Sequence, residues 1–424
     1  MTISFESRWG TRRVKTLTTK IGSGKTPSGG SESYLASGVT FLRSQNIHFD
    51  GLRLDDVVYI SEATHREMRG TKVKPGDVLL NITGASLGRV SRAPEGLGEA
   101  NVNQHVCIIR PNAEAHARYL AYALSSQPIQ EQISELQVGG NREGLNFEQV
   151  GNLTVPAALA EEQRRIADFL DAETARIDQL ALKRRQMRSL LTLKRERVIE
   201  STLGLERAQM TGGLVPLKYL AADVTVGIVI TPAKWYVEAD GIPALRGLNV
   251  KPNFISTGDL VQISAEGHAE NRKSRLNSGD VVVVRTGQAG AAAVVPAELD
   301  GANCIDLIVV RPGRKLSPRY LQYVLNSGYA SARVTEHSVG SIQAHFNVGA
   351  MKQIPIPSIP RTEQDEIVRL LDIRVGALDL LHRKLDHQEQ LLTERRQALI
   401  TAAVTGQFDV TTASGRNVTD GVSA

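Results

Sequence analysis

Two long stretches of the chain place apolar residues seven positions apart, as a helix in a coiled coil does. In residues 160–205 the spacing is kept by Leu170, Ile177, Leu191 and Val198, with Arg184 as an interruption. The second stretch has five leucines in strict heptads, namely Leu371, Leu378, Leu385, Leu392 and Leu399. Ile367 and Leu381 are expected on the adjoining core position of the same helix. The pattern predicts two helices, each about 60 Å long at about 40 residues.

A different pattern fills the residues before each helix. Short apolar runs alternate with Gly, Pro, Asn and Ser clusters, which is typical of strands joined by turns. The clearest runs are residues 77–80, 106–109, 281–284 and 307–310. Shorter helical patterns follow at residues 117–126 and 318–327.

The chain is a tandem duplication. A shift of 201 residues aligns Arg118-Tyr119-Leu120 with Arg319-Tyr320-Leu321, and it also aligns Glu162-Gln163 with Glu363-Gln364. Earlier in each copy the shift is 203, and one short loop deletion is expected to account for the change.

The predicted fold is α+β, with two duplicated β-rich regions that are each followed by a long helix. We call residues 1–157 and 213–357 the first and second head. Residues 158–212 and 358–410 are the predicted spacer helices, and residues 411–424 a flexible tail. A helix of this length needs a partner, and the other copy supplies one. Antiparallel pairing would relate the two halves by a pseudo-two-fold axis, an arrangement suited to reading two DNA segments one to two turns apart.

Composition adds few restrictions. Fifty Lys and Arg against 45 Asp and Glu give a net charge of +5, which permits nucleic-acid binding without requiring it. Two cysteines, Cys107 and Cys304, exclude a disulfide framework and are too few for a zinc site. No apolar run is long enough for a membrane helix, and residues 1–10 lack the apolar core of an export signal. We expect a cytoplasmic protein.

Several paired blocks resemble the specificity subunits of type I restriction–modification systems. They are residues 42–47 and 245–250, the Gly-Asp-Val turns at 76–78 and 279–281, and the Pro156/Glu162-Gln163 and Pro357/Glu363-Gln364 pairs. The resemblance covers about residues 9–410. It implies two target recognition domains that each read one half of a split, asymmetric duplex DNA sequence.

The resemblance also implies partners and a division of labour. Two modification subunits and up to two restriction subunits would bind this chain, and the restriction subunits would be ATP-dependent. S-adenosylmethionine and ATP would belong to those partners, so no cofactor is expected here.

The motifs of a methyltransferase or of a nucleotide-binding loop are not found in the sequence, which agrees with this division of labour. The sequence has no Asn/Asp-Pro-Pro-aromatic tetrapeptide, and the phosphate-loop lookalike at residues 22–26 lacks the spacing and runs into Pro27. Two other classes remain open: an enzyme with an unrecognised site, and a coiled-coil scaffold whose heads bind proteins. A specificity subunit of another kind of modification complex is a nearer variant.

Residues that could contact DNA are the polar and basic side chains of the predicted loops. In the first head these are Lys25, Thr26, Arg43, Gln45, Asn46, Arg66, Arg69, Lys72, Lys74, Thr83, Ser86, Arg89, Asn103, Gln104, His105, Asn141 and Arg142. In the second head they are Thr231, Lys234, Trp235, Arg246, Asn249, Arg272, Lys273, Arg275, Arg285, Thr286, Gln288, Ser341, Gln343 and His345.

Comparison of the copies divides these candidates. The pairs Arg43/Arg246 and Asn46/Asn249 occur in both heads although the heads should read different bases, so we expect phosphate anchors or contacts within the fold ahead of base readout. Residues that differ between copies, such as Gln104 against Ile305 and Arg142 against Gln343, are better candidates for specificity. The repeated His65 and His268 are expected to make a structural hydrogen bond.

Overall fold

A computed structural model describes residues 7–137, 144–338, 346–407 and 409–410. The predicted tail lies outside these residues. The chain divides into two compact units, one formed by residues 1–185 with 386–424 and the other by residues 186–385. Within the described ranges, no helix combines the length and apolar character that crossing a membrane needs.

The described residues of unit 1 form two four-stranded sheets and two smaller strand pairs. In the first sheet the strands lie in the order β2 (Thr18–Ser23), β11 (Val106–Pro111), β8 (Val78–Asn81) and β9 (Val90–Arg92). In the second sheet the strands lie in the order β6 (Val58–Ile60), β3 (Val39–Leu42), β10 (Ala100–Val102) and β7 (Lys72–Val73). Two small pairs join β1 (Thr11–Arg13) to β12 (Thr154–Pro156) and β4 (Ile47–His48) to β5 (Gly51–Leu52).

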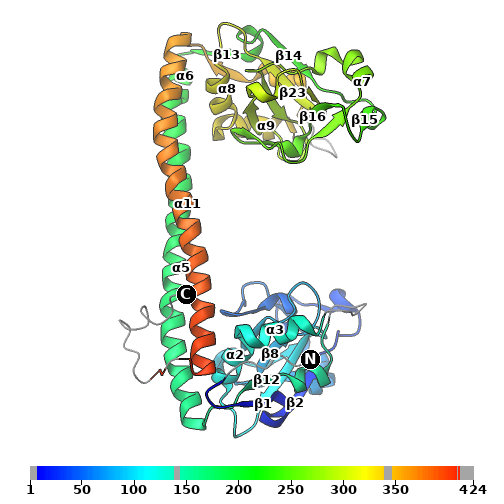
Figure 1. Ribbon diagram of the computed structural model, residues 1–424, viewed down its shortest axis with the longest axis vertical. Helices are drawn as coiled ribbons and strands as arrows, with labels where there is room; N and C mark the ends of the chain where they lie inside the picture. The colour runs from blue at the N-terminus through cyan, green and yellow to red at the C-terminus, as the bar shows by residue number, and fades with distance from the viewer. Residues whose placement is uncertain (1–6, 138–143, 339–345, 408, 411–424) are drawn as a thin grey trace. The chain divides into compact units, whose positions relative to one another are not determined.

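The largest buried cluster of unit 1 lies between the first of these sheets and helices, and a second cluster joins residues of the two sheets. The short helices are α1 (Glu62–Glu67), α2 (Ala117–Ser125), α3 (Gln127–Glu135) and α4 (Phe147–Asn152). Helix α2 lies beside this sheet (Figure 1). Buried Leu80 and Ile109 of the sheet pack in one cluster with Leu120 and Leu124 of α2. The predicted strands at 77–80 and 106–109 and the helix at 117–126 are confirmed.

Unit 2 repeats this plan. Its first sheet has the order β14-β23-β20-β21, formed by β14 (Asp223–Val226), β23 (Leu307–Arg311), β20 (Val281–Val284) and β21 (Ala292–Val294). The second has the order β15-β19-β16-β22, formed by β15 (Tyr236–Val237), β19 (Val261–Ile263), β16 (Ile242–Leu245) and β22 (Asn303–Cys304). The remaining strands are β13 (Leu214–Pro216), β24 (Pro355–Pro357), β17 (Val250–Lys251) and β18 (Phe254–Ile255). Its short helices are α6 (Leu205–Met210), α7 (Ala265–Glu270), α8 (Pro318–Leu325), α9 (Gly328–Ser338) and α10 (Val348–Gln353).

Two long helices, α5 (Ala160–Leu203) and α11 (Arg361–Thr405), contribute one part each to both units. In unit 1 they run antiparallel, with Arg396 Nε 3.4 Å from Asp178 Oδ1. In unit 2 they also run antiparallel, and Arg195 Nε lies 2.8 Å from Asp379 Oδ1. Arg195 and Arg396 are 201 residues apart, as are Asp178 and Asp379. The same ion pair therefore forms in each unit with the two helices exchanging roles, which confirms the predicted antiparallel pairing.

One detail of the heptad assignment is wrong. The leucine positions lie in the helix seam, where Leu371, Leu378, Leu385 and Leu399 are buried, but Leu381 is 46% exposed. The second seam position of α11 is instead occupied by residues such as Val375, Glu389 and Arg396. Polar residues can occupy it because cross-helix ion pairs satisfy their charges: Arg185 Nε lies 2.7 Å from Glu389 Oε1.

Candidate nucleic-acid interface

The strand register of the first head brings four loops to one end of the two sheets. In the antiparallel sheet, the start of β11 lies beside the ends of β2 and β8, with Cys107 opposite Ser23 and Val106 opposite Asn81. In the other sheet, β3 and β10 run parallel, so both end at this edge. We call residues 24–27, 43–46, 82–89 and 103–105 the strand-end loops of the first head.

Most predicted residues of the first head lie in these loops. They are Lys25, Thr26, Arg43, Gln45, Asn46, Thr83, Ser86, Arg89, Asn103, Gln104 and His105. Arg69 and Lys72 belong to a different place, the turn Arg69–Thr71 and edge strand β7, where the Lys72 carbonyl accepts from Arg110 Nη2 at 3.3 Å. Asn141 and Arg142 lie outside the described residues.

A chain of hydrogen bonds links three strand-end loops of the first head. Thr26 Oγ1 donates to Gln104 Oε1 (2.6 Å), and Gln104 Nε2 lies 2.9 Å from His105 Nε2. His105 Nδ1 is in turn 2.5 Å from Thr83 Oγ1. Gln104 is exposed, so this chain holds a neutral amide at the surface of the loop end.

Arg43 and Asn46 are mainly contacts within the fold. Asn46 is 1% exposed. Its Oδ1 accepts from the Arg43 backbone N–H (2.8 Å), and its Nδ2 donates to the carbonyls of Arg53 (3.0 Å) and Asp56 (3.1 Å). Arg43 Nη2 donates to the same Asp56 carbonyl at 3.0 Å.

The second head repeats this arrangement. Asn249, also 1% exposed, accepts from the Arg246 N–H (2.8 Å) and donates to the Asp259 carbonyl (3.0 Å). Arg246 Nη2 donates to that carbonyl at 3.2 Å. The repeat of these residues fits either phosphate anchors or contacts within the fold, and the hydrogen bonds described here favour contacts within the fold. We leave Asn46 and Asn249 out of the proposed DNA-contacting set because they offer almost no surface.

The strand-end loops of the second head are residues 227–231, 246–249, 285–291 and 305–306. Arg285 and Gln288 lie in the third of them, between β20 and β21. Lys234 lies in the turn Pro232–Trp235, with its Nζ 3.9 Å from the ring centroid of Trp235. Arg272, Lys273 and Arg275 occupy the region equivalent to Arg69 and Lys72, and Gln343 and His345 lie outside the described residues.

A charged pair stands at this end of the second head. Arg285 Nη1 donates to Asp306 Oδ1 at 2.6 Å, and Thr286 Oγ1 donates to Asp306 Oδ2 at 3.3 Å. Arg285 Nε donates to the Phe346 carbonyl at 3.2 Å. Sequence reasoning missed Asp306. A lone carboxylate directly before the apolar run of β23 was the signal that could have found it.

The structure corrects the expected single loop deletion. The loop between β8 and β9 is one residue longer than the loop between β20 and β21. The loop between β10 and β11 is likewise one residue longer than that between β22 and β23. Both length changes therefore fall in strand-end loops, and Gln104 has no one-to-one counterpart in Ile305.

The repeated histidines confirm the structural expectation. His65 is buried, and its Nδ1 lies 2.5 Å from Asn101 Oδ1. Asn101 Nδ2 donates to the Met68 carbonyl (3.0 Å) and to Thr71 Oγ1 (2.7 Å). His268 Nδ1 contacts Asn303 Oδ1 in the same way. These bonds fasten the turn after each short helix to β10 in the first head and to β22 in the second.

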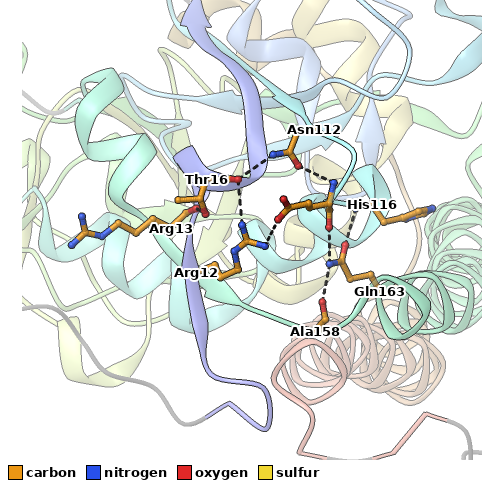
Figure 2. Close-up of polar contacts among 8 residues, drawn as sticks. Arg12, Arg13, Thr16, Asn112, His116, Ala158 and Gln163 are labelled. Carbon is orange, nitrogen blue, oxygen red and sulfur yellow. Dashed lines mark hydrogen bonds and ion pairs between the residues drawn. The ribbon is translucent and has the colours of Figure 1, made fainter.

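The repeated glutamine fastens the start of each long helix to the head that precedes it in the chain. Figure 2 shows Gln163 at the start of α5, where its Oε1 accepts from the His116 N–H (2.7 Å) and its Nε2 donates to the Ala158 carbonyl (2.8 Å). Gln364 does the same at the start of α11, accepting from the Ser317 N–H (2.7 Å) and donating to the Ile359 carbonyl (2.9 Å).

A second joint involves the repeated Arg and Tyr residues. Asp171 of α5 accepts from Arg118 Nη1 (2.6 Å) and Tyr122 Oη (2.8 Å). Asp372 of α11 accepts from Arg319 Nη2 and Tyr323 Oη, both at 2.8 Å. Burial raises the pKa of Tyr323 to about 12, so its hydroxyl remains a donor to this carboxylate. The most similar blocks of the two copies are therefore the joints between the heads and the helices.

Comparison with known proteins identifies the family. A model of the type I restriction modification DNA specificity domain matches residues 7–186 and 247–388, more than half of the chain. The StySPI specificity subunit of a type I restriction enzyme from Salmonella potsdam is 22% identical over 418 residues, 94% of this chain and 89% of that protein.

Two solved structures share the fold. One comes from work on complex assembly and conformational transition of the type I R-M system; it has a TM-score of 0.72 at 19% identity and covers 96% of this chain and 100% of its own. The HsdS subunit from Thermoanaerobacter tengcongensis has a TM-score of 0.51 at 19% identity, covering 94% and 97%.

Proposed function

This chain belongs to the type I restriction modification DNA specificity family, and we propose that each head reads one half of a split, asymmetric duplex sequence. The chain is a specificity subunit, the non-catalytic component that recognises DNA sequence. We propose residues 1–157 and 213–357 as the recognition domains, residues 158–212 and 358–410 as the spacer helices that set the gap, and the cytoplasm as the place of action.

The observation that carries this proposal is the position of the differences between the heads. The buried contacts of Asn46 and His65 are repeated by Asn249 and His268, whereas chemistry and loop length change together at the strand-end loops. A surface that varies on a constant framework is what two different recognition sequences require. We therefore propose that these loops face DNA, with basic side chains on phosphates and residues that differ between the heads on base edges.

The long helices offer a place for partner subunits. In unit 1, Leu180 of α5 and Leu391 of α11 are 46% and 47% exposed. In unit 2 the equivalent residues, Leu381 of α11 and Leu190 of α5, are 46% and 65% exposed. Because each unit carries the same exposed leucines with the helices exchanged, we propose two equivalent docking sites, one for each of two modification subunits. Restriction subunits would join this complex.

The test is a map of modified bases across the genome, in strains with and without this gene. We expect a split, asymmetric motif that loses methylation only in the deletion strain. If the motif stays methylated while the modification subunit is expressed, the protein-binding scaffold becomes the better account. Salt supplies an independent check, since a chain that neutralises six to ten phosphates loses about a thousandfold or more in affinity between about 50 and 200 mM salt.

A further inference from the structure

Gln104 is held at both ends of its amide group. It lies in the three-residue loop between β10 and β11, and its side chain is exposed. Oε1 accepts from Thr26 Oγ1 at 2.6 Å, and Nε2 is 2.9 Å from His105 Nε2. An exposed glutamine ordinarily has free rotation about its side-chain torsions, and these two bonds remove most of it.

In this orientation of the Gln104 amide, every hydrogen bond of the chain joins one donor to one acceptor. The Gln104 amide nitrogen can only donate, so His105 Nε2 must accept. The proton of the neutral imidazole then lies on Nδ1, which donates to Thr83 Oγ1, 2.5 Å away. The order of donors and acceptors is consistent along the whole chain, from Thr26 to Thr83.

The backbone beneath Gln104 is rigid as well. The Gly24 N–H donates to the carbonyls of Asn103 (3.1 Å) and Val106 (3.2 Å), and the His105 N–H donates to Asn103 Oδ1 (3.1 Å). A side chain at Gly24 is impossible here, because its Cβ would lie 1.7 Å from the Val102 carbonyl oxygen. The strand-end loops carrying Thr26 and Gln104 are therefore locked together.

Each end of the Gln104 amide keeps one unused hydrogen-bonding position. Oε1 has a second lone pair and Nε2 a second N–H, and both lie in the amide plane. Adenine presents the complement in the major groove, with its N6 amino group as donor and N7 as acceptor. Guanine presents two acceptors, so it satisfies only the N–H.

We propose that Gln104 reads one adenine in the half-site of the first head. Its Nε2 donates to adenine N7 and its Oε1 accepts from adenine N6. Thr26 and His105 act as positioning residues that hold the amide for this pairing. The inference rests on the proposed function, and it names the base and the atoms that this head recognises.

The experiment uses the full chain in complex with its modification subunit. Methylation rates are measured on duplexes that carry each of the four base pairs, in turn, at each position of the first half-site. Wild type should favour A·T at one position by about 5- to 150-fold. Gln104→Ala and Gln104→Met should abolish this preference and leave the other positions unchanged; Met controls for side-chain length. Gln104→Glu presents only acceptors, so it should favour cytosine, whose N4 amino group donates.

A positioning variant separates loss of contact from loss of order. Thr26→Val removes the bond to Oε1, so adenine should remain the favoured base with a smaller preference. Wild type without any sequence preference would defeat the proposed function itself. If wild type reads a split sequence but the Ala and Met variants keep every first-half preference within about twofold, Gln104 is not the reader. An affected position in the second half-site, or one that favours a base other than adenine, also overturns the inference.

Discussion

The two heads present different chemistry on the same scaffold. At the loop end of the first head, Thr26, Gln104 and His105 form a neutral hydrogen-bonded chain. At the equivalent end of the second head, Arg285 and Asp306 form an ion pair at 2.6 Å. An amide and a guanidinium suit different bases, since glutamine pairs with adenine and arginine with guanine. Under the proposed function, exchanging these side chains would change the base that is recognised without rebuilding the fold.

The framework itself contains one instructive difference. In the first head, Arg110 makes two bonds to buried Asp77, Nε to Oδ1 and Nη2 to Oδ2, both at 2.7 Å, and these bonds raise the pKa of Arg110. In the second head, Arg311 instead donates to Asp223 at 3.1 Å, and its Nε is 3.8 Å from Asp280.

The cause is a single reversal of charge on the neighbouring strand. Lys20 stands opposite Arg110 in β2, whereas Asp223 stands opposite Arg311 in β14. Asp223 competes for the guanidinium, which leaves Asp280 less well compensated. Burial accordingly raises the pKa of Asp280 above its ordinary value, although the Asn277 N–H and Arg311 act against the shift.

The largest effect should come from Asp77→Asn. It leaves a half-buried guanidinium without its counter-charge, and we expect the first head to lose about 3 kcal/mol of local stability. Asp280→Asn should cost less than about 1 kcal/mol, because that carboxylate is already poorly compensated and the Asn277 bond can persist. Hydrogen exchange of the full chain, followed in β8 and β11 against β20 and β23, measures each head separately. If both substitutions lowered the local stability of their heads equally, the two carboxylates would be equally well compensated, which contradicts the difference described here.

The second effect concerns the buried asparagines. Asn46→Ala removes three bonds and should lower the local stability of residues 43–56 by about 2 kcal/mol. Asn249→Ala removes the two described bonds and should cost residues 246–259 about 1 kcal/mol. Exchange rates of these segments provide the measurement. Unchanged stability with weaker DNA binding would instead make these residues DNA contacts.

A third variant tests whether the heads act independently. Arg285→Ala should relax one position of the second half-site by about 1–3 kcal/mol and leave the first half-site untouched. Arg285→Lys keeps the charge but not the planar fork, so it should restore little of the preference. Methylation of duplexes substituted at each position gives the answer. A change in the first half-site would show that the heads are coupled.

The smallest effect should come from Lys25→Ala. As an exposed cation in a strand-end loop, Lys25 is expected to contact a phosphate and no base. Its loss should weaken binding to all sequences alike and lower the slope of log affinity against log salt by about one. A titration at several salt concentrations measures this slope. An altered base preference would assign Lys25 to readout.

Sequence alone predicted the duplication, the long helices and the main strands because their periodicity is strong over many residues. It could not decide the role of Arg43 and Asn46, since a repeated residue looks the same whether it holds the fold or DNA. Their role became clear from hydrogen bonds to the backbone carbonyls of Arg53 and Asp56, which lie seven and thirteen residues further along the chain from Asn46 and Arg43, respectively. Asp306 and the polar seam position at Arg396 were missed because their partners, Arg285 and Asp178, are distant in sequence.

Replacing the second head by the first tests the central claim most directly. In such a chain residues 213–357 are exchanged for the matching part of residues 1–157, with both long helices kept, and modified bases are mapped in a host without other methylation. The account predicts a split palindrome, in which the second half is the reverse complement of the original first half. A second half that keeps its original bases would contradict the claim that each head reads its own half-site.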